Sequence, residues 1–261
     1  MDLRVIRWKC TLLGYTPANM APSVRPLVVL LLLLVPRSDA TRLLLVRHGC
    51  TFMNEHLSQP GKGWGAAGFV DPGLWDTGLT PNGEAQAREL NAQLRARQSA
   101  GEPKVDLLLA SLLRRALATA ELGFAGVFRT SQRVEPLAAE RCYLSSDVGS
   151  PRAELQRDFS PAWSISADTL AEGWWFQGDG SAEWRPPGTY LHPGECGPAF
   201  YARMGRLIAA LRACEGEHGV VALVAHWGVL HALTGRSFAN CEWADMTVAE
   251  LPDAPFVEPD V

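Results

Sequence analysis

The stretch from Leu43 to Asn54, which reads LLLVRHGCTFMN, constrains this chain more than any other. Its apolar beginning is too short for a helix and is typical of a strand buried on both faces of a parallel sheet. Such a strand would bring Arg47 and His48 to its carboxyl end, where open α/β sheets bind their ligands. A cation and an imidazole followed by the flexible Gly49 suit an anion that must be held and attacked. The stretch therefore predicts a phosphate site.

Two further apolar runs predict two more buried strands, at Val105 to Ala110 and at Val220 to Ala225. The later run ends in His226, as the first strand ends in His48. If the strands that carry them are neighbours in the sheet, the two imidazoles lie side by side at its carboxyl edge.

Helical patterns alternate with these strands. Thr80 can cap the first helix, whose pattern ends at Gly101, and Ser111 can cap the second. This alternation predicts an α/β fold, a three-layer α/β/α sandwich with a mostly parallel central sheet. The other helices are expected from about Leu112 to Leu122, from Pro198 to Gly216 and from Trp227 to Leu233, and two weaker strands at Val134 to Ala139 and Met246 to Leu251.

Two segments have no clear periodicity. Thr51 to Thr77 is rich in Gly, Pro, Asp and Trp and predicts a long irregular loop beside the site, in which Asp71 and Asp76 suit turns and caps. Cys142 to Pro193 predicts an insertion with short helices over one mouth of the site. Its tryptophans have two interpretations, local packing or an aromatic wall for an apolar or planar substrate group.

Residues 1–40 differ from the rest of the chain. The apolar run from Leu27 to Val35 has nine residues, too few for a stable membrane span as a helix. Arg25 precedes it and small residues end at Ala40, so the segment from Met20 resembles a secretory signal peptide. The alternative is an extension, and in both cases residues 41–261 form the catalytic domain. The localisation stays open between the cytoplasm and, for a signal peptide, a secretory or organellar compartment.

The charge and the cysteines narrow the function further. The net charge is −4, and because the first 40 residues carry +3, the remaining chain carries −7. An acidic body speaks against nucleic acid as a partner, so an anion site must be a local basic pocket. The six cysteines form no C-x-x-C pair, which speaks against a zinc knuckle.

Moving a phosphoryl group needs cationic donors, an in-line nucleophile and a proton for the leaving oxygen. Arginines can neutralise the charge that Mg²⁺ neutralises elsewhere, so the scheme needs no metal and no other cofactor. A carboxyl whose pKa is raised by burial can be the acid and later activate water. The candidates are Arg47, Arg115 and His226 for charge, Thr51 and Asn54 as neutral donors, His48 as nucleophile and Glu140 as acid.

Four blocks of the chain carry a family resemblance. RHGCTFMN (residues 47–54) matches the R-H-G-x-T-x-x-N opening of the histidine phosphatase superfamily, also called phosphoglycerate mutase-like. LTPNGEAQA (79–87), SLLRRALATA (111–120) and VALVAHWGVLHALTG (221–235) resemble three later blocks of that superfamily, in its order. The resemblance implies a phosphoglycerate mutase-like fold and a phosphohistidine intermediate on His48. It implies Arg47, Arg115 and His226 on the phosphate and Glu140 as proton donor.

The chain also departs from the family pattern. Trp227 replaces the first glycine after the second histidine, so the rim of the site should be bulkier there. Glu140 lacks the flanking residues that the family pattern has, and Arg114 is the alternative to Arg115. The four remaining histidines are expected at the surface or in loops: His56, His192, His218 and His231.

These features predict a metal-independent phosphatase that hydrolyses a phosphate monoester, either a small phosphorylated molecule or a phosphoprotein. The insertion with R-H-Y-G that cofactor-dependent phosphoglycerate mutases carry is absent from the sequence, which favours hydrolysis over a mutase reaction. The alternatives are mutase-type phosphoryl transfer and a non-catalytic protein that binds a phosphorylated ligand.

Overall fold

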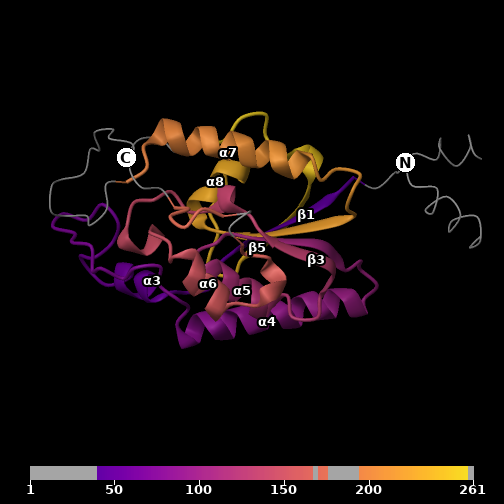
Figure 1. Ribbon diagram of the computed structural model, residues 1–261, viewed down its shortest axis with the longest axis horizontal. Coiled ribbons are helices and arrows are strands. Elements are labelled where there is room, and N and C mark those ends of the chain that lie inside the picture. The colour runs from indigo at the N-terminus through magenta and orange to yellow at the C-terminus, as the bar shows by residue number, and fades with distance from the viewer. Residues whose placement is uncertain (1–39, 167–169, 176–193, 258–261) are drawn as a thin grey trace, which may run out of the picture. The chain divides into compact units, whose positions relative to one another are not determined.

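The computed structural model describes residues 40–166, 170–175 and 194–257, and the side chains of all of these except 128–130 (Figure 1). The signal peptide or extension expected at residues 1–40 therefore lies outside the described residues, apart from Ala40. Part of the expected insertion, 167–169 and 176–193, lies outside them as well. Within the described ranges no helix is long and apolar enough to cross a membrane.

A five-stranded sheet forms the centre, with the strand order β3-β2-β4-β1-β5. Its first four strands pair in parallel, and β5 runs antiparallel to β1 at one edge. The three apolar runs of the sequence are confirmed as three neighbouring strands in the interior of the sheet. The strands are β1 (Arg42–Arg47), β2 (Val105–Ala110), β3 (Phe128–Val134), β4 (Val220–Ala225) and β5 (Trp243–Thr247).

Helices cover both faces of the sheet, and this makes the predicted three-layer α/β/α sandwich correct. In Figure 1, α7 and α8 lie on one side of the strands and α4 and α5 on the other. The helices are α3 (Phe52–Leu57), α4 (Pro81–Ser99), α5 (Arg114–Gly123), α6 (Arg152–Asp158), α7 (Gly197–Arg212) and α8 (Trp227–Thr234).

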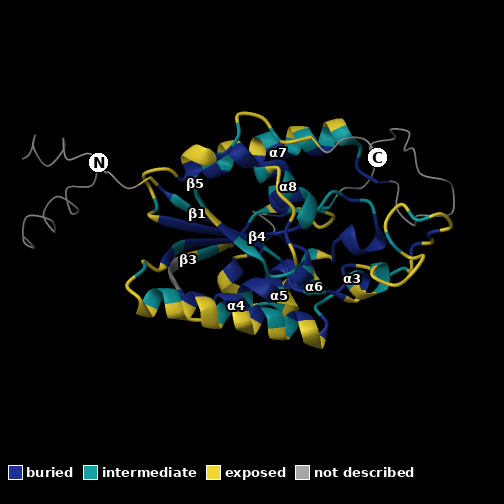
Figure 2. Ribbon diagram, turned by 180° about the vertical axis from the view of Figure 1, so that it is seen from behind, coloured by how far each residue is buried: buried dark blue, intermediate teal, exposed yellow. Residues whose placement is uncertain are grey.

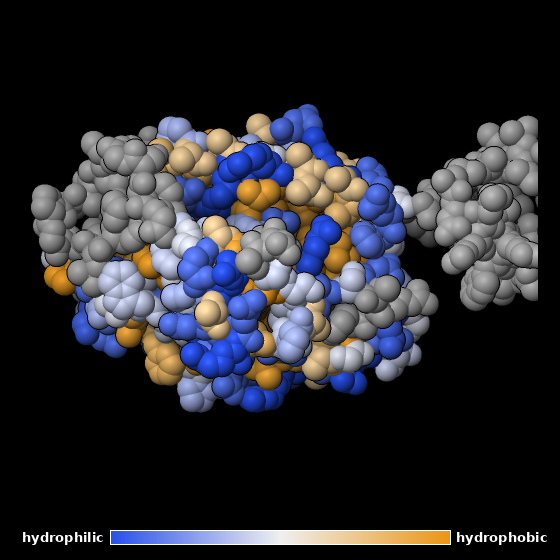
Figure 3. Space-filling view, viewed as in Figure 1, coloured by the Kyte–Doolittle hydropathy of each residue, from blue (hydrophilic) through white to orange (hydrophobic). Residues whose placement is uncertain are grey.

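The two helical layers explain why β1 is apolar along its length. Leu43 and Leu45 point into the cluster formed with α7 and α8, whereas Leu44 and Val46 point into the cluster formed with α4 and α5. Successive side chains of a strand face opposite sides, so a sheet covered twice needs an uninterrupted apolar run. Figure 2 shows β1 as buried, while the outward side of α4 is exposed. On the face drawn in Figure 3, hydrophilic residues alternate with small apolar areas.

Two expected strands were misplaced. β3 ends at Val134, where the expectation put its beginning, and a 3-10 turn follows at Pro136–Ala138. Pro136 has no backbone N–H for a strand ladder, and the Glu135 side chain caps the turn by accepting from the N–H of Leu137. The expected edge strand at Met246 to Leu251 begins and ends earlier, as β5, and a 3-10 turn follows it at Val248–Glu250.

The helix starts follow the capping chemistry. Thr80 caps α4 as expected, and Gly235 ends α8 in the left-handed conformation with a φ of 67°. The expected loop from Thr51 is wrong at its beginning, because Thr51 and Asn54 form a capping box that starts α3. α7 ends at Arg212, four residues before the expected Gly216.

The start of α5 shows a cap that comes from elsewhere in the chain. The helix begins at Arg114 and not at Leu112, and Asp76 accepts hydrogen bonds from the N–H groups of Arg114 (2.9 Å) and Ser150 (2.8 Å). Asp76 is therefore confirmed as a capping residue. Ser111, expected in that role, instead lies beside the His226 ring.

Candidate active site

The two histidines at the strand ends lie side by side. β1 and β4 are adjacent and Arg47 pairs with Ala225, so the residues after them, His48 and His226, leave the sheet together. Their ring centroids are 5.2 Å apart. The expectation that neighbouring strands bring both imidazoles to the carboxyl edge is confirmed.

One hydrogen bond fixes the tautomer of His48. Its Nδ1 lies 2.7 Å from the carbonyl oxygen of Gly49, and because a carbonyl can only accept, Nδ1 carries the ring proton. Nε2 then keeps its lone pair. Burial, together with the nearby positive charges of Arg115 and Arg47, lowers the pKa of His48 well below its usual value. The lowered pKa favours the neutral ring, the form in which an imidazole can act as a nucleophile.

Two glycines hold this histidine against the start of α4. A Cβ on Gly49 would lie 2.6 Å from the carbonyl oxygen of Gly83, and a Cβ on Gly83 would lie 2.0 Å from the carbonyl oxygen of Cys50. The backbones touch, so neither position accepts a side chain. In addition, the Gly49 N–H donates to Thr119 Oγ1 of α5 at 3.0 Å. The first two sequence blocks, residues 47–54 and 79–87, are therefore in direct backbone contact.

Arg115 lies in the site and Arg114 does not. The Arg115 guanidinium is buried and donates to His226 Nδ1 (3.2 Å), to the carbonyl of Ser146 and to Asp147 Oδ1 (2.8 Å). One residue earlier on α5, Arg114 turns away and pairs with Asp158 at 2.7 Å. A rotation of one residue around the helix therefore separates the two alternatives, and Arg115 lines the cavity whereas Arg114 does not.

Arg47 supplies the second guanidinium. Its Nη1 donates to the carbonyl of Phe238 at 2.6 Å, and within the described part of the chain its buried Nε has no hydrogen-bond partner. Burial lowers the pKa of Arg47 from its usual value, and an arginine starts so high that it still stays charged. A buried donor without a partner is suited to an anionic ligand.

His226 lies behind the cavity. Its Nδ1 accepts from Arg115, so its proton is on Nε2, 2.7 Å from the Ser111 hydroxyl. Burial and the positive charge of Arg115 lower its pKa well below the usual value. The described residues that line the cavity include Arg47, His48, Arg115 and Glu140. They do not include His226.

Thr51 and Asn54 also line the cavity, at the start of α3. Asn54 Oδ1 accepts from the Thr51 backbone N–H at 3.1 Å and from Asn240 Nδ2 at 3.2 Å. Asn240 also donates to the carbonyl of His48 at 3.1 Å. Sequence reasoning missed Asn240, which lies in a loop without a recognisable pattern.

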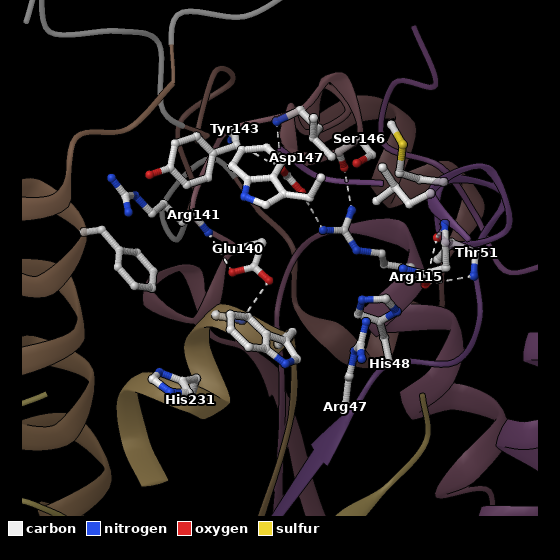
Figure 4. A pocket seen from close by; sticks show the side chains of 18 of the residues that line it. Arg47, His48, Thr51, Arg115, Glu140, Arg141, Tyr143, Ser146, Asp147 and His231 are labelled. Carbon is white, nitrogen blue, oxygen red and sulfur yellow. Dashed lines mark hydrogen bonds and ion pairs between the residues drawn. The ribbon is translucent and has the colours of Figure 1, made fainter. Parts of the chain in front are cut away.

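Glu140 lies across the cavity from His48 (Figure 4). Its carboxylate accepts from the N–H of Arg141 at 2.9 Å and from the N–H of Gly228, in the first turn of α8, at 3.1 Å. Burial, and then the negative charge of Asp147, raise the pKa of Glu140 above its usual value. A raised pKa favours the protonated form of this carboxyl.

An ion pair from α7 holds the segment that carries Glu140. Arg203 Nη1 donates to the carbonyls of Leu137 (2.8 Å) and Ala139 (2.7 Å), and its Nε donates to Glu195 Oε1 at 3.0 Å. The side chains of Arg203 and Glu195 are only 13% and 5% exposed. Neither residue was predicted. In the sequence, an arginine on an amphipathic helix is expected to be solvent-exposed, and nothing marks Glu195 as its partner.

The cavity has a volume of about 390 Å³. Its wall includes five aromatic side chains, Trp64, Tyr143, Phe200, Tyr201 and Trp227. His231, expected at the surface or in a loop, lies on α8 and is partly exposed; it also lines the cavity and stacks on Trp227 with centroids 5.2 Å apart. His192 lies outside the described residues.

The tryptophans of the 142–193 segment serve packing where they are described. Trp163 is fully buried, and Trp174 Nε1 donates to the carbonyl of Ser150 at 2.9 Å. Among the described residues, neither lines the cavity, and the short helices expected in the segment include α6. Within the same described ranges, no group of three His, Cys, Asp or Glu side chains is placed to hold a metal ion.

Comparison with known proteins identifies the family. The sequence profile described as "Histidine phosphatase superfamily (branch 1)" matches residues 43–254. This chain belongs to the histidine phosphatase superfamily. The superfamily resemblance of the four sequence blocks is therefore confirmed, and members of the superfamily are phosphatases and mutases.

Solved structures share the fold of this superfamily member. A candidate alpha-ribazole-5'-P phosphatase from Escherichia coli is 23% identical, with a TM-score of 0.51, and the match covers 84% of this chain and 100% of that one. Phosphoglycerate mutase from Bacillus anthracis is 14% identical, with a TM-score of 0.50, and the match covers 84% and 93% of the two chains. No curated protein is similar enough in sequence to count as a match.

Proposed function

We propose that this member of the histidine phosphatase superfamily is a metal-independent phosphatase, which hydrolyses a phosphate monoester through a phosphohistidine on His48. The observation that carries the proposal is the hydrogen bond from His48 Nδ1 to the Gly49 carbonyl, which leaves the Nε2 lone pair for a cavity flanked by Arg47 and Arg115. A neutral imidazole between two guanidinium groups suits attack on a dianionic phosphoryl group.

In the first step His48 Nε2 forms a bond to phosphorus and the bond from phosphorus to the ester oxygen breaks. Glu140 gives its proton to that oxygen, so the product leaves as an alcohol. Arg47 and Arg115 neutralise the phosphoryl oxygens, with Thr51 and Asn54 as neutral donors. In the second step the Glu140 carboxylate takes a proton from a water molecule, which attacks phosphorus, and inorganic phosphate leaves the regenerated His48.

We assign His226 a positioning role through Arg115. The family resemblance implies that this histidine touches the phosphate, whereas its hydrogen bonds support an action one step removed. Its Nδ1 accepts from Arg115 Nε, and its ring packs beside His48. A substitution of His226 should therefore disturb both the orientation of Arg115 and the nucleophile.

Acid quenching during turnover of phenyl phosphate in the presence of a metal chelator, followed by peptide mass analysis, tests the proposal. We expect a phosphoryl adduct on His48, and loss of both adduct and turnover in His48→Ala. The matched control His218→Ala changes a histidine that does not line the cavity and should keep both. An adduct on another residue, or turnover that survives in His48→Ala, contradicts the proposal.

The same preparation separates hydrolysis from the alternatives. We propose a small phosphorylated molecule as substrate, because a cavity of about 390 Å³ has room for one; a phosphoprotein substrate would have to insert a single side chain. Stimulation by a bisphosphorylated sugar acid, with isomerisation faster than phosphate release, would indicate a mutase. Phosphate binding without turnover would indicate a non-catalytic binding protein.

A further inference from the structure

The cavity has two chemically different ends, and Glu140 lies between them. On one side of Glu140 are Arg115 and His48, and on the other are Arg141, Tyr143 and His231 (Figure 4). A group that protonates the leaving oxygen must lie beside that oxygen. With the phosphoryl group at the arginine end, the leaving group extends past Glu140 into the other end of the cavity.

That other end is lined by rings held in fixed orientations. Trp227 donates its Nε1 proton to Ser237 Oγ at 2.8 Å and stacks on His231 with an interplanar angle of 16°. Across the cavity, the Tyr143 ring lies 4.8 Å from Trp64. The Arg141 guanidinium lies over the Tyr143 ring, 4.2 Å from its centroid.

These contacts order the rings before a ligand arrives. Aromatic side chains have few rotatable bonds, and each of these is held by a hydrogen bond, a stacked partner or a cation. The protein side chains therefore lose little conformational freedom when a flat ring enters between them. Trp227 stands where the family pattern has a glycine, so this part of the cavity belongs to this chain rather than to the superfamily.

We propose that the substrate is a phosphate monoester whose leaving group carries an aromatic ring, which stacks in this part of the cavity against Trp227 and Tyr143. The inference rests on the proposed function for the direction of the leaving group. Purely apolar packing would also accept a saturated ring of the same size, so the experiment compares the two.

The test uses 2-phenylethyl phosphate and 2-cyclohexylethyl phosphate as substrates of the wild-type protein. Their leaving alcohols have the same functional group, and the cyclohexyl compound is the bulkier and more apolar of the two. We expect kcat/KM to favour the phenyl compound by about 10-fold, the size of one or two aromatic contacts. Trp227→Leu should bring the ratio close to one, whereas the matched control Trp75→Leu, outside the cavity lining and 51% exposed, should keep it.

A ratio at or below one in the wild-type protein overturns the inference while leaving the proposed function intact. If neither ester is hydrolysed and no adduct forms, the proposed function fails, and binding decides the inference separately. Calorimetry on the wild-type protein with 3-phenylpropylphosphonate and 3-cyclohexylpropylphosphonate, in which carbon replaces the ester oxygen, should show tighter binding of the phenyl compound. Equal affinities overturn the inference, and this measurement needs no variant to fold.

Discussion

Gly228 offers a way to change the proposed acid without unfolding the protein. A Cβ at this position would lie 2.6 Å from Glu140 Oε1 and would push the carboxyl aside. The carboxyl would then lose the hydrogen bond that the Gly228 N–H donates to it. The clashing atom is the far end of a flexible side chain, so the carboxyl can swing aside. We therefore expect Gly228→Ala to move the acid and leave the fold in place.

The magnitudes separate the two effects. Alanine in a helix favours folding by about 0.5–1 kcal/mol over glycine, and the lost hydrogen bond costs about 1 kcal/mol. The free energy of unfolding should thus stay within about 1 kcal/mol of the wild-type value. General acid catalysis typically raises a rate by about 10²–10⁴-fold, and a misplaced acid loses much of this gain. The value of kcat/KM for an alkyl phosphate should therefore fall by about 100-fold.

Two assays check this expectation. Urea unfolding followed by tryptophan fluorescence reports stability, and kcat/KM reports the step that forms the phosphoenzyme. An aryl phosphate with a strongly activated leaving group needs no proton, so its kcat/KM should fall far less than that of the alkyl ester.

The control is Gly205→Ala on α7, where a Cβ meets open space. It should stabilise the protein by about 0.5–1 kcal/mol without changing the kinetics. Equal losses on the alkyl and the activated aryl ester in Gly228→Ala would refute Glu140 as the leaving-group acid.

Three further predictions concern the surroundings of the site. Asp147→Asn removes a negative charge that raises the pKa of Glu140, so the limb at which kcat/KM falls with rising pH should move to lower pH relative to the wild-type protein, measured with one substrate. An unmoved limb would contradict this coupling. Arg203→Met leaves a buried carboxylate without its partner and should cost about 3–5 kcal/mol in urea unfolding; Arg206→Met on the exposed side of the same helix should stay within about 0.5 kcal/mol. Gly83→Ala puts a Cβ 2.0 Å from a backbone oxygen, which cannot swing aside, and should cost at least about 1–3 kcal/mol by the same measurement. Wild-type stability of this variant would contradict the close backbone contact.

Sequence reasoning succeeded where the pattern and the chemistry are local. The runs that became β1, β2 and β4 are apolar throughout because helices cover both faces of the sheet, and this predicts strands in its interior. The same reasoning placed His48 and His226 together, since strands of that kind end at a common edge.

It failed where the determining contact is distant or the strand is not apolar. β3 reads FRTSQRV and lies at the sheet edge, where an apolar run is not required. Asp76 was expected to cap, but a local pattern cannot reveal that the helix it caps is α5, which begins 38 residues later in the chain. In the site, the arrangement of Arg203 and Glu195 depends on how α7 packs against the segment that carries Glu140.

The contact between Gly49 and Gly83 has a consequence for how this sequence can change over generations. Each glycine makes room for backbone of the other's segment, so a larger residue at either position requires the two segments to separate. Separation would shift the backbone beside His48 relative to Arg115, which lies on a different element, α5. Selection for activity in a library that randomises both codons should therefore return glycine at both positions. The two positions, far apart in the sequence, are thus under one shared structural constraint.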